Sequence, residues 1–325
     1  MNQHSAMSGT RISLRVISAV PVAERVRELV LAPETGDLPP FSPGAHVEVS
    51  LPDGDTRPYS LIDFDGSAAA PAQYRLAVLL EEDSEGGSRF MHALSRGAMV
   101  TINAPKNNFP LHEGDAPALL IAGGIGVTPI ISMATALKAA GRPYRLVYAA
   151  QDAARMAFRE VLKAAHGDAL QLHFDDRAGG PLPLQSLIEA AAKGTHLYVC
   201  GPRPMIAAAR ETAEAAGFTP ERVHFELFER AAPQDGDQPF EVEIASTGQV
   251  FTIPPGQSII DVLEAEGIDL MYDCQRGDCG ICQTDVLEGE PDHRDVVLSQ
   301  AERDGGEVMQ ICVSRAKSAR LKLDL

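Results

Sequence analysis

The chain has 325 residues, of which 45% are hydrophobic and 22% are charged. This is the composition of an ordinary globular protein, and it excludes a disordered or fibrous chain, while the length predicts more than one domain. The 45 acidic residues outnumber the 28 basic residues, and the resulting net charge of −17 makes nucleic acid and anionic membrane surfaces poor partners.

The charge is spread unevenly along the chain. From residue 239 to the C-terminus there are 17 Asp or Glu and only seven Lys or Arg, so this segment alone carries a net charge of −10. No apolar run approaches the ~18 residues of a membrane-spanning helix, and residues 1–9 are polar and show no secretory signal. We therefore expect a cytoplasmic protein with reduced thiols and no membrane partner.

The first 230 residues show two successive sequence patterns. From residue 10 to about residue 110, alternating runs such as 11–17 and 46–51 are separated by Pro, Gly and Asp clusters, which predicts an antiparallel β-barrel. After residue 116, apolar runs at 118–122, 144–149 and 196–200 alternate with helical patterns at 129–140, 157–165 and 204–216. This alternation predicts a parallel sheet covered by helices.

A third module is predicted after a Pro-, Gly- and Asp-rich stretch, 231–239, that has the composition of a linker. Its first two apolar runs, 240–245 and 249–253, predict a hairpin. A short helix is predicted next, over 258–265, with Ser258 as its N-cap.

Four of the five cysteines lie in this third module, as Cys274-x4-Cys279-x2-Cys282 followed after 29 residues by Cys312. The spacing is that of a plant-type 2Fe-2S cluster, in which three thiolates share one loop and the fourth arrives from a distant segment. A structural zinc site is the alternative, but such sites usually contain two Cys-x2-Cys pairs and this chain has one. No Cys is followed two residues later by His, so the pattern is not that of a Rieske centre.

Two turns in the second module have the composition of a dinucleotide site. Residues 123–129, Gly-Gly-Ile-Gly-Val-Thr-Pro, follow a predicted strand and open a helix with Pro129 near its first position, where a helix N-terminus can hold a pyrophosphate. Alone, the turn is equally consistent with an ordinary tight turn, and Pro129 departs from the Rossmann fingerprint. The second turn begins at Cys200-Gly201-Pro202, and both are expected at the carboxyl edge of one sheet. Cys200 is either a small core residue or a neighbour of a nicotinamide ring.

The barrel contains a candidate flavin strand. Arg57, Tyr59 and Ser60 offer a guanidinium group, an aromatic face and a hydroxyl donor on one short run. Residues 86–88, Gly-Gly-Ser, precede a helical stretch that ends near Leu94, and Ser88 is expected to cap it. Taken alone, residues 86–88 are more typical of an ordinary loop and cap than of a phosphate site.

In their order along the chain, these motifs resemble the phthalate dioxygenase reductase family, which includes the vanillate demethylase and carnitine monooxygenase reductases. The resemblance covers nearly the whole chain and implies a multi-domain protein: an FMN-binding antiparallel β-barrel at 10–112, an NADH-binding α/β domain of the ferredoxin–NADP reductase type at 113–230, a linker at 231–238, and a plant-type ferredoxin domain of the α+β, β-grasp class at 239–325.

The resemblance also implies residue roles. Ser60, Cys200 and Glu226 are expected to act at the reacting rings, and the expected ligands of the single 2Fe-2S cluster are Cys274, Cys279, Cys282 and Cys312. The expected FMN and NADH contacts are Arg57, Tyr59, Ser60, Gly87, Ser88, Gly124, Gly126, Thr128, Cys200, Gly201 and Phe228.

These modules imply a reductase component that passes electrons from NADH through FMN and the cluster to a separate Rieske-type oxygenase. Asp152, which follows the predicted strand 144–149, would repel the 2′-phosphate of NADPH, and no basic pair stands there. A stand-alone NADH:acceptor oxidoreductase and a redox sensor are the alternatives. A self-sufficient oxygenase is another, with His173, Asp175 and either His196 or His224 as a facial triad.

Overall fold

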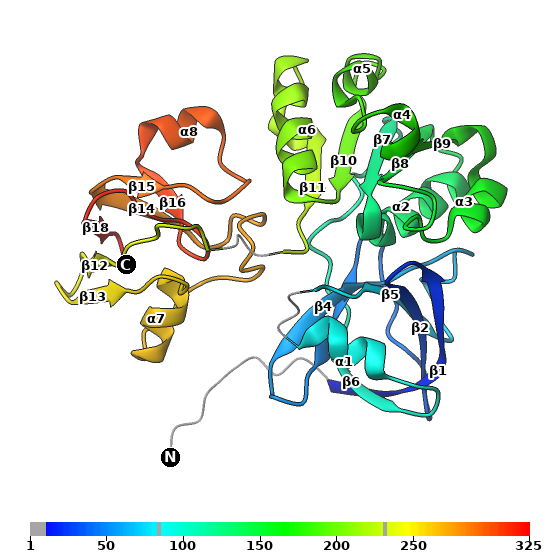
Figure 1. The fold of residues 1–325 in the computed structure, drawn as a ribbon, viewed down its shortest axis with the longest axis horizontal. Coiled ribbons are helices and arrows are strands. Elements are labelled where there is room, and N and C mark those ends of the chain that lie inside the picture. Colours follow the sequence, from blue (N-terminus) through cyan, green and yellow to red (C-terminus); the bar gives the residue numbers. More distant parts are fainter. Residues whose placement is uncertain (1–10, 83–85, 230–232) are drawn as a thin grey trace. The chain divides into compact units, whose positions relative to one another are not determined.

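The computed structural model describes residues 11–82, 86–229 and 233–325, and the chain divides into two compact units, Met1–Glu226 and Leu227–Leu325 (Figure 1). The first unit holds the barrel and the parallel sheet, and the second holds the four clustered cysteines. Among these described residues, no helix has both the length and the apolar character needed to cross a bilayer. Residues 231 and 232, at the start of the expected linker, lie outside the described residues.

Six antiparallel strands form the barrel, in the order β4-β3-β6-β1-β2-β5. Ile62, which follows β4, donates its N–H to the carbonyl of Arg75 on β5 (2.9 Å), and this bond links the two ends of the sheet order. The barrel prediction is confirmed. The strands are β1 (Arg11–Ala23), β2 (Val26–Pro33), β3 (His46–Ser50), β4 (Thr56–Ser60), β5 (Tyr74–Leu79) and β6 (Met99–Asn103), and helix α1 (Gly87–Ala93) precedes β6.

The second half of the first unit is a five-stranded parallel sheet in the order β11-β10-β7-β8-β9. Its central strand, β7, is buried along its whole length, as a strand covered on both faces should be. The strands are β7 (Ala118–Gly123), β8 (Tyr144–Ala150), β9 (Leu170–Phe174), β10 (His196–Cys200) and β11 (Val223–Glu226). The helices are α2 (Val127–Ala139), α3 (Arg159–His166), α4 (Asp175–Ala178), α5 (Leu184–Glu189) and α6 (Arg203–Ala215).

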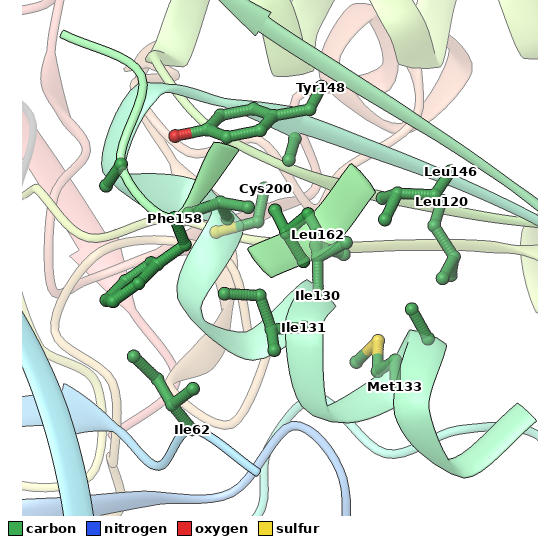
Figure 2. Close-up of a cluster of buried hydrophobic side chains, with 14 of the residues drawn as sticks. Ile62, Leu120, Ile130, Ile131, Met133, Leu146, Tyr148, Phe158, Leu162 and Cys200 are labelled. Atoms are coloured by element: carbon green, nitrogen blue, oxygen red, sulfur yellow. The ribbon is translucent and has the colours of Figure 1, made fainter. Parts of the chain in front are cut away.

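Helix α2 joins the sheet to the barrel. Its Ser132 hydroxyl donates to the Leu61 carbonyl (2.7 Å) and accepts the N–H of Asp63 (2.9 Å), both in the segment that follows β4. Beside these bonds, Ile62 belongs to the same buried cluster as Ile131 of α2 and Phe158, which precedes α3 (Figure 2). The barrel and the sheet therefore share a core.

The second unit is built on a five-stranded mixed sheet in the order β13-β12-β18-β14-β16, in which β12 and β18 run parallel. The predicted hairpin and the predicted helix are confirmed, and Ser258 caps that helix in a capping box with Asp261. The strands are β12 (Phe240–Ile244), β13 (Val250–Ile253), β14 (Gln283–Glu288), β15 (Pro291–Asp292), β16 (Val308–Gln310), β17 (Arg315–Ala316) and β18 (Arg320–Leu323). The helices are α7 (Ile259–Ala265) and α8 (Gln300–Gly305).

Two local predictions were wrong. Ser88 does not cap α1: the N-cap is Gly86, with φ 104°, and the Ser88 hydroxyl instead accepts the N–H of Glu81 (3.1 Å). Helix α2 begins at Val127, so Pro129 is its third residue and not its first. The first turn of a helix has no backbone acceptor for its N–H groups, so proline is tolerated at either place.

Three histidines stack at the amino edge of the parallel sheet, around the first residues of β10 and β11. The rings of His112 and His196 lie 3.7 Å apart and nearly parallel, and Nδ1 of His196 lies 3.0 Å from Nε2 of His224. Burial, and then the neighbouring imidazoles, lower the pKa of both His112 and His224 to about 4. The stack therefore exists in its neutral form near pH 7.

The unfolding free energy of the first unit should fall between pH 7.5 and pH 5. The unfolded histidines, with a pKa of ~6.5, bind protons in this range while the stacked ones do not, so protonation favours the unfolded state. Thermal unfolding of wild type and His224→Gln between pH 7.5 and pH 5 tests this. His173→Gln, on the outer strand β9, is the control. An unchanged pH dependence in His224→Gln would contradict it.

Candidate functional site

The order of the parallel strands reverses between β7 and β10. The chain runs from β7 outward to β8 and β9 on one side, and then returns to place β10 and β11 on the other side. In open parallel sheets, ligands bind at the carboxyl ends of the strands where the order reverses in this way. The turn after β7, Gly124–Gly126, and the turn after β10, which begins at Gly201, both lie at this point.

Glycines allow these two turns to touch through their backbones. A Cβ atom on Gly126 would lie 2.2 Å from the carbonyl oxygen of Cys200, and one on Gly201 would lie 3.0 Å from Cα of Gly123. Any side chain at Gly126 would therefore push the turns apart. The expectation that both turns share the carboxyl edge of one sheet is confirmed.

Cys200 and Thr128, predicted for the dinucleotide site, and Glu226, predicted to lie near the flavin, are at the same edge. Ala122 of β7, Cys200 of β10 and Glu226 of β11 are register partners, so the last two are side by side and both are buried. The Cys200 side chain packs in the core of the sheet (Figure 2), and the Thr128 hydroxyl donates to the carbonyl of Ile125 (3.1 Å). Cys200 therefore meets the Gly126 turn with its backbone carbonyl.

On the barrel, Arg57, Tyr59 and Gly87 come together. A Cβ on Gly87 would lie 2.7 Å from Cγ of Arg57 and 3.3 Å from Oη of Tyr59, so only glycine fits between α1 and β4. Burial raises the pKa of Tyr59 to about 12, which keeps its hydroxyl protonated. Ser60 is buried at the end of the same strand. These residues leave an aromatic ring and a cation on one side of the barrel, which suits a phosphorylated planar ligand.

The facial-triad hypothesis was wrong. His173 lies on β9 and contacts Asp175 (3.2 Å), whereas His196 and His224 lie on β10 and β11, with β7 and β8 in between. Among the described residues, no group of three or more His, Cys, Asp or Glu side chains has the geometry to hold a single metal ion.

In the second unit, the four predicted cluster cysteines converge. Hydrogen bonds with Cys279 and Cys312 hold the pKa of the Cys274 thiol below its usual range, and a hydrogen bond with Cys312 does the same for Cys282. The backbone N–H of Arg276 also donates to the sulfur of Cys274 (3.3 Å). Cys274 is thus paired with Cys279 and Cys312, and Cys282 with Cys312; four thiols gathered in this way and met by a backbone donor are the soft ligand set of an iron–sulfur cluster, so these residues fit that group.

Backbone geometry shapes the loop that carries three of these cysteines. Gly277 and Gly280 have φ angles of 82° and 77°, and a Cβ on Gly277 would lie 2.9 Å from Cα of Asp295. The carbonyl of Gly277 accepts the N–H of Val296 (2.9 Å), and the buried carboxylate of Asp278 accepts the N–H of Leu227 (2.8 Å). Two hydrogen bonds, one from Val296 and one from Leu227, therefore fix the position of the loop.

Sequence reasoning missed Gln310, a fully buried residue beside the cluster cysteines. Its Oε1 lies 3.4 Å from the Cys282 sulfur, and its Nε2 donates to Oε1 of Gln283 (3.3 Å), its register partner across β14 and β16. No spacing signal pointed to it, because β16 ends at Gln310 and a turn, closed by the N–H of Ser314 on the Gln310 carbonyl (3.0 Å), leads to Cys312.

The fold and these sites define a modular iron–sulfur flavoprotein oxidoreductase. Residues 242–317, which contain all four cysteines, match the 2Fe-2S iron-sulfur cluster binding domain family, and this match decides against the zinc alternative. Residues 106–223 match the N-terminal domain family of the dimethylamine monooxygenase subunit DmmA-like proteins.

Whole-chain relatives give the family. The chain is 42% identical to the phenoxybenzoate dioxygenase subunit beta of Ectopseudomonas oleovorans, over 97% of both chains, and 44% identical to the vanillate O-demethylase oxidoreductase of Pseudomonas sp. strain HR199, over 89% of this chain and 92% of that one. The solved structure of phthalate dioxygenase reductase, described as modular for electron transfer from pyridine nucleotides to [2Fe-2S], has 34% identity and a TM-score of 0.71 over 97% of this chain and 98% of that one.

The chain belongs to the phthalate dioxygenase reductase-like family of oxidoreductases. It also matches the structures of an intact type IV self-sufficient cytochrome P450 monooxygenase and of full-length CYP116B46 from Tepidiphilus thermophilus, and it spans 41% and 42% of their lengths.

Replacing Gln310 should lower the reduction potential of the cluster. A cysteine bound to iron has no thiol proton, so the amide is expected to turn and donate Nε2–H to the Cys282 sulfur, which stabilises the added electron. A redox titration of Gln310→Leu followed by EPR is expected to give a fall of roughly tens of millivolts. Gln249→Leu, on the exposed turn before β13, is the matched control, and equal potentials in both variants would refute the role.

Proposed function

We propose that this protein is the reductase component of a two-component oxygenase system, which carries electrons from NADH through FMN and its own 2Fe-2S cluster to a separate Rieske-type oxygenase. The observation that carries the proposal is the presence on one chain of two closely packed glycine turns where the strand order reverses between β7 and β10, a candidate flavin strand in the adjoining barrel, and a four-cysteine cluster loop. Relatives over nearly the full length are named as a dioxygenase subunit and a demethylase oxidoreductase.

The chemistry requires all three groups. NADH gives up two electrons together as hydride and becomes NAD⁺, a 2Fe-2S cluster accepts one electron at a time, and a bound flavin supplies the exchange between the two. Held by Cys274, Cys279, Cys282 and Cys312, a cluster would pass these electrons on one at a time. Plant-type clusters lie near roughly −400 mV and Rieske centres between roughly −150 and +300 mV, so the final transfer is downhill.

The chain's own residues bind and orient these groups. Arg57, Tyr59 and Ser60 hold the flavin ring, and Gly87 and Ser88 hold the phosphate of FMN, for which the short α1 turn leaves no evident adenylate site. Gly124, Gly126 and Thr128 support the pyrophosphate of NADH, while Cys200 and Gly201 border the nicotinamide through their backbones. Glu226 and Phe228 are assigned to the flavin edge.

The module boundaries follow the same assignment: FMN barrel 10–112, NADH domain 113–230, linker 231–238 and ferredoxin domain 239–325. Supporting them, the compact units divide close by, after Glu226. Within the second unit, Asp237 is bound by Arg294 through both carboxylate oxygens (2.5 and 2.9 Å), so the end of the proposed linker is fixed to the ferredoxin module.

The acceptor is a protein with a basic docking surface. The segment from residue 239 onward carries a net charge of −10, and charge of one sign mainly raises the encounter rate with an oppositely charged partner. A cytoplasmic location supplies both the NADH and the reducing conditions that the thiols need. A haem monooxygenase is the second candidate acceptor, because the chain matches the self-sufficient cytochrome P450 structures along 97% of its length.

A visible spectrum before and after anaerobic addition of NADH tests the proposal. The purified holoprotein should show flavin and iron–sulfur absorbance, and both should bleach. In Cys282→Ser the flavin should still bleach, while NADH-dependent reduction of cytochrome c is lost because the cluster outlet is broken. A colourless holoprotein, or undiminished cytochrome reduction in the variant, would overturn the proposal, while continued turnover with an external acceptor excludes a pure redox sensor.

NADH should be preferred over NADPH, and Asp152 should contribute to the preference. Arg155, the nearest cation to this carboxylate, is held between Asp152 (3.7 Å) and Glu24 (3.8 Å) and does not neutralise a 2′-phosphate. Asp152→Ser should raise kcat/KM for NADPH on the order of tenfold, the effect of removing one charge near another. Steady-state dye reduction measures kcat/KM, and Asp168→Ser, in the turn before β9, is the control. If Asp152→Ser gives no gain with NADPH, Asp152 does not contribute to the preference.

A further inference from the structure

Ser132 stands out in helix α2 as a fully buried hydroxyl in an apolar segment. Its neighbours Ile130, Ile131, Met133 and Ala134 are all buried, and its own exposed fraction is 1%. A serine inside a helix usually bonds to the carbonyl four residues earlier in its own helix. The hydroxyl of Ser132 instead leaves the helix and makes two bonds to the barrel, 2.7 Å to the Leu61 carbonyl and 2.9 Å to the Asp63 N–H.

The two segments that Ser132 joins are continuous with the two proposed ligand sites. Leu61 follows Ser60, the last residue of β4, directly. Helix α2 follows the Gly124–Gly126 turn directly, so only four residues separate its first residue, Val127, from Ser132. One hydroxyl therefore connects the end of the flavin strand to the helix that begins at the dinucleotide turn.

Both anchoring points are rigid. The N–H of Leu61 donates to the Ala45 carbonyl (2.8 Å) and that of Ile62 to the Arg75 carbonyl (2.9 Å). The buried Asp63 carboxylate accepts the N–H groups of the following turn, residues 65–68. On the helix side, Ile131 and Phe158 pack with Ile62 (Figure 2). A displacement at Ser132 therefore shifts the flavin strand β4 relative to the dinucleotide turn before α2.

We propose that Ser132 is a positioning residue for hydride transfer, which fixes the dinucleotide turn against the flavin strand and so sets the approach of the nicotinamide to the flavin. This inference rests on the proposed function. In the step concerned, the C4–H bond of the nicotinamide breaks and an N5–H bond of the flavin forms, and two electrons and one proton move together. Such a transfer is sensitive to spacing, because a displacement of about 1 Å can cost roughly a hundredfold in rate.

Removing the hydroxyl should change spacing without unfolding the unit. Ser132→Ala leaves the Leu61 carbonyl and the Asp63 N–H buried without their partner, and each will move to find another. The apolar contacts around Ile62 remain and keep the barrel on the sheet. Ser132→Cys keeps the approximate volume but bonds weakly, and Ser132→Thr keeps the hydroxyl.

The test is anaerobic stopped-flow reduction of the bound flavin by NADH in wild type, the three Ser132 variants, and Ser186→Ala as control, whose hydroxyl bonds only within its own α5 segment (3.1 Å to the Pro183 carbonyl). The limiting reduction rate of Ser132→Ala should fall by roughly tenfold to a hundredfold. The Kd for NADH, the flavin midpoint potential and the cluster spectrum should stay near their wild-type values, while the charge-transfer absorbance of the stacked rings weakens. Ser132→Cys should be intermediate, Ser132→Thr should recover the rate, and Ser186→Ala should match wild type.

A wild-type rate and charge-transfer band in Ser132→Ala would overturn the inference, and so would a shift of the flavin potential large enough to account for the slower rate. If Ser132→Ala does not fold, the Cys and Thr variants decide: equal rates in these two, whatever the value, would show that the hydroxyl is not required. Failure of NADH to reduce the wild-type flavin is a different result, which rejects the proposed function itself.

Discussion

The close backbone approach of two turns at the carboxyl edge of the parallel sheet is the constraint on which the first unit depends. Gly126 lies against the Cys200 carbonyl, where a Cβ would be 2.2 Å from the oxygen, and no other residue permits this contact. Because β7 and β10 are neighbours in the sheet but far apart in sequence, the contact brings residues about 75 positions apart to one point on the carboxyl edge of the sheet. Everything assigned to the dinucleotide follows from that juxtaposition.

The second unit also depends on glycines, here in the loop that carries three of the cluster cysteines. Its loop must turn several N–H groups inward while carrying three cysteines within nine residues, and Gly277 and Gly280 adopt the positive φ angles that this requires. The supports of the loop are polar and buried: Asp278 accepts the N–H of Leu227, and the carboxylate of Asp295 accepts the N–H groups of Val297 and Leu298. Loss of either carboxylate would leave buried donors unpaired, so the loop depends on these acids as much as on its glycines.

Local signals in the sequence were strong enough to predict the main elements. The strand runs at 118–122 and 196–200, the hairpin of the third module and the Ser258 cap are all confirmed, because each depends on residues adjacent in the chain. Edge strand β9 was missed although its residues, Leu-Gln-Leu-His-Phe, alternate apolar and polar as a half-buried strand should. The Ser88 cap failed because a residue seven positions earlier, Glu81, supplies the hydroxyl with a donor. Residue spacing could not predict the histidine stack, the Gln310 amide or the Ser132 bridge, because their partners come together only in the folded chain.

The buried polar groups that the sequence did not reveal share a physical property. Ser132, Gln310 and Asp278 each lie in a largely buried environment, and each bonds to a group on a segment remote in sequence. Apolar packing tolerates small rearrangements, but a buried hydrogen bond fixes distance and direction, because losing it leaves an unpaired donor or acceptor. Electron transfer is sensitive to placement in the same way. A unit that holds the proposed dinucleotide turn against the proposed flavin strand therefore gains from a polar contact at their junction, and Ser132 occupies that junction.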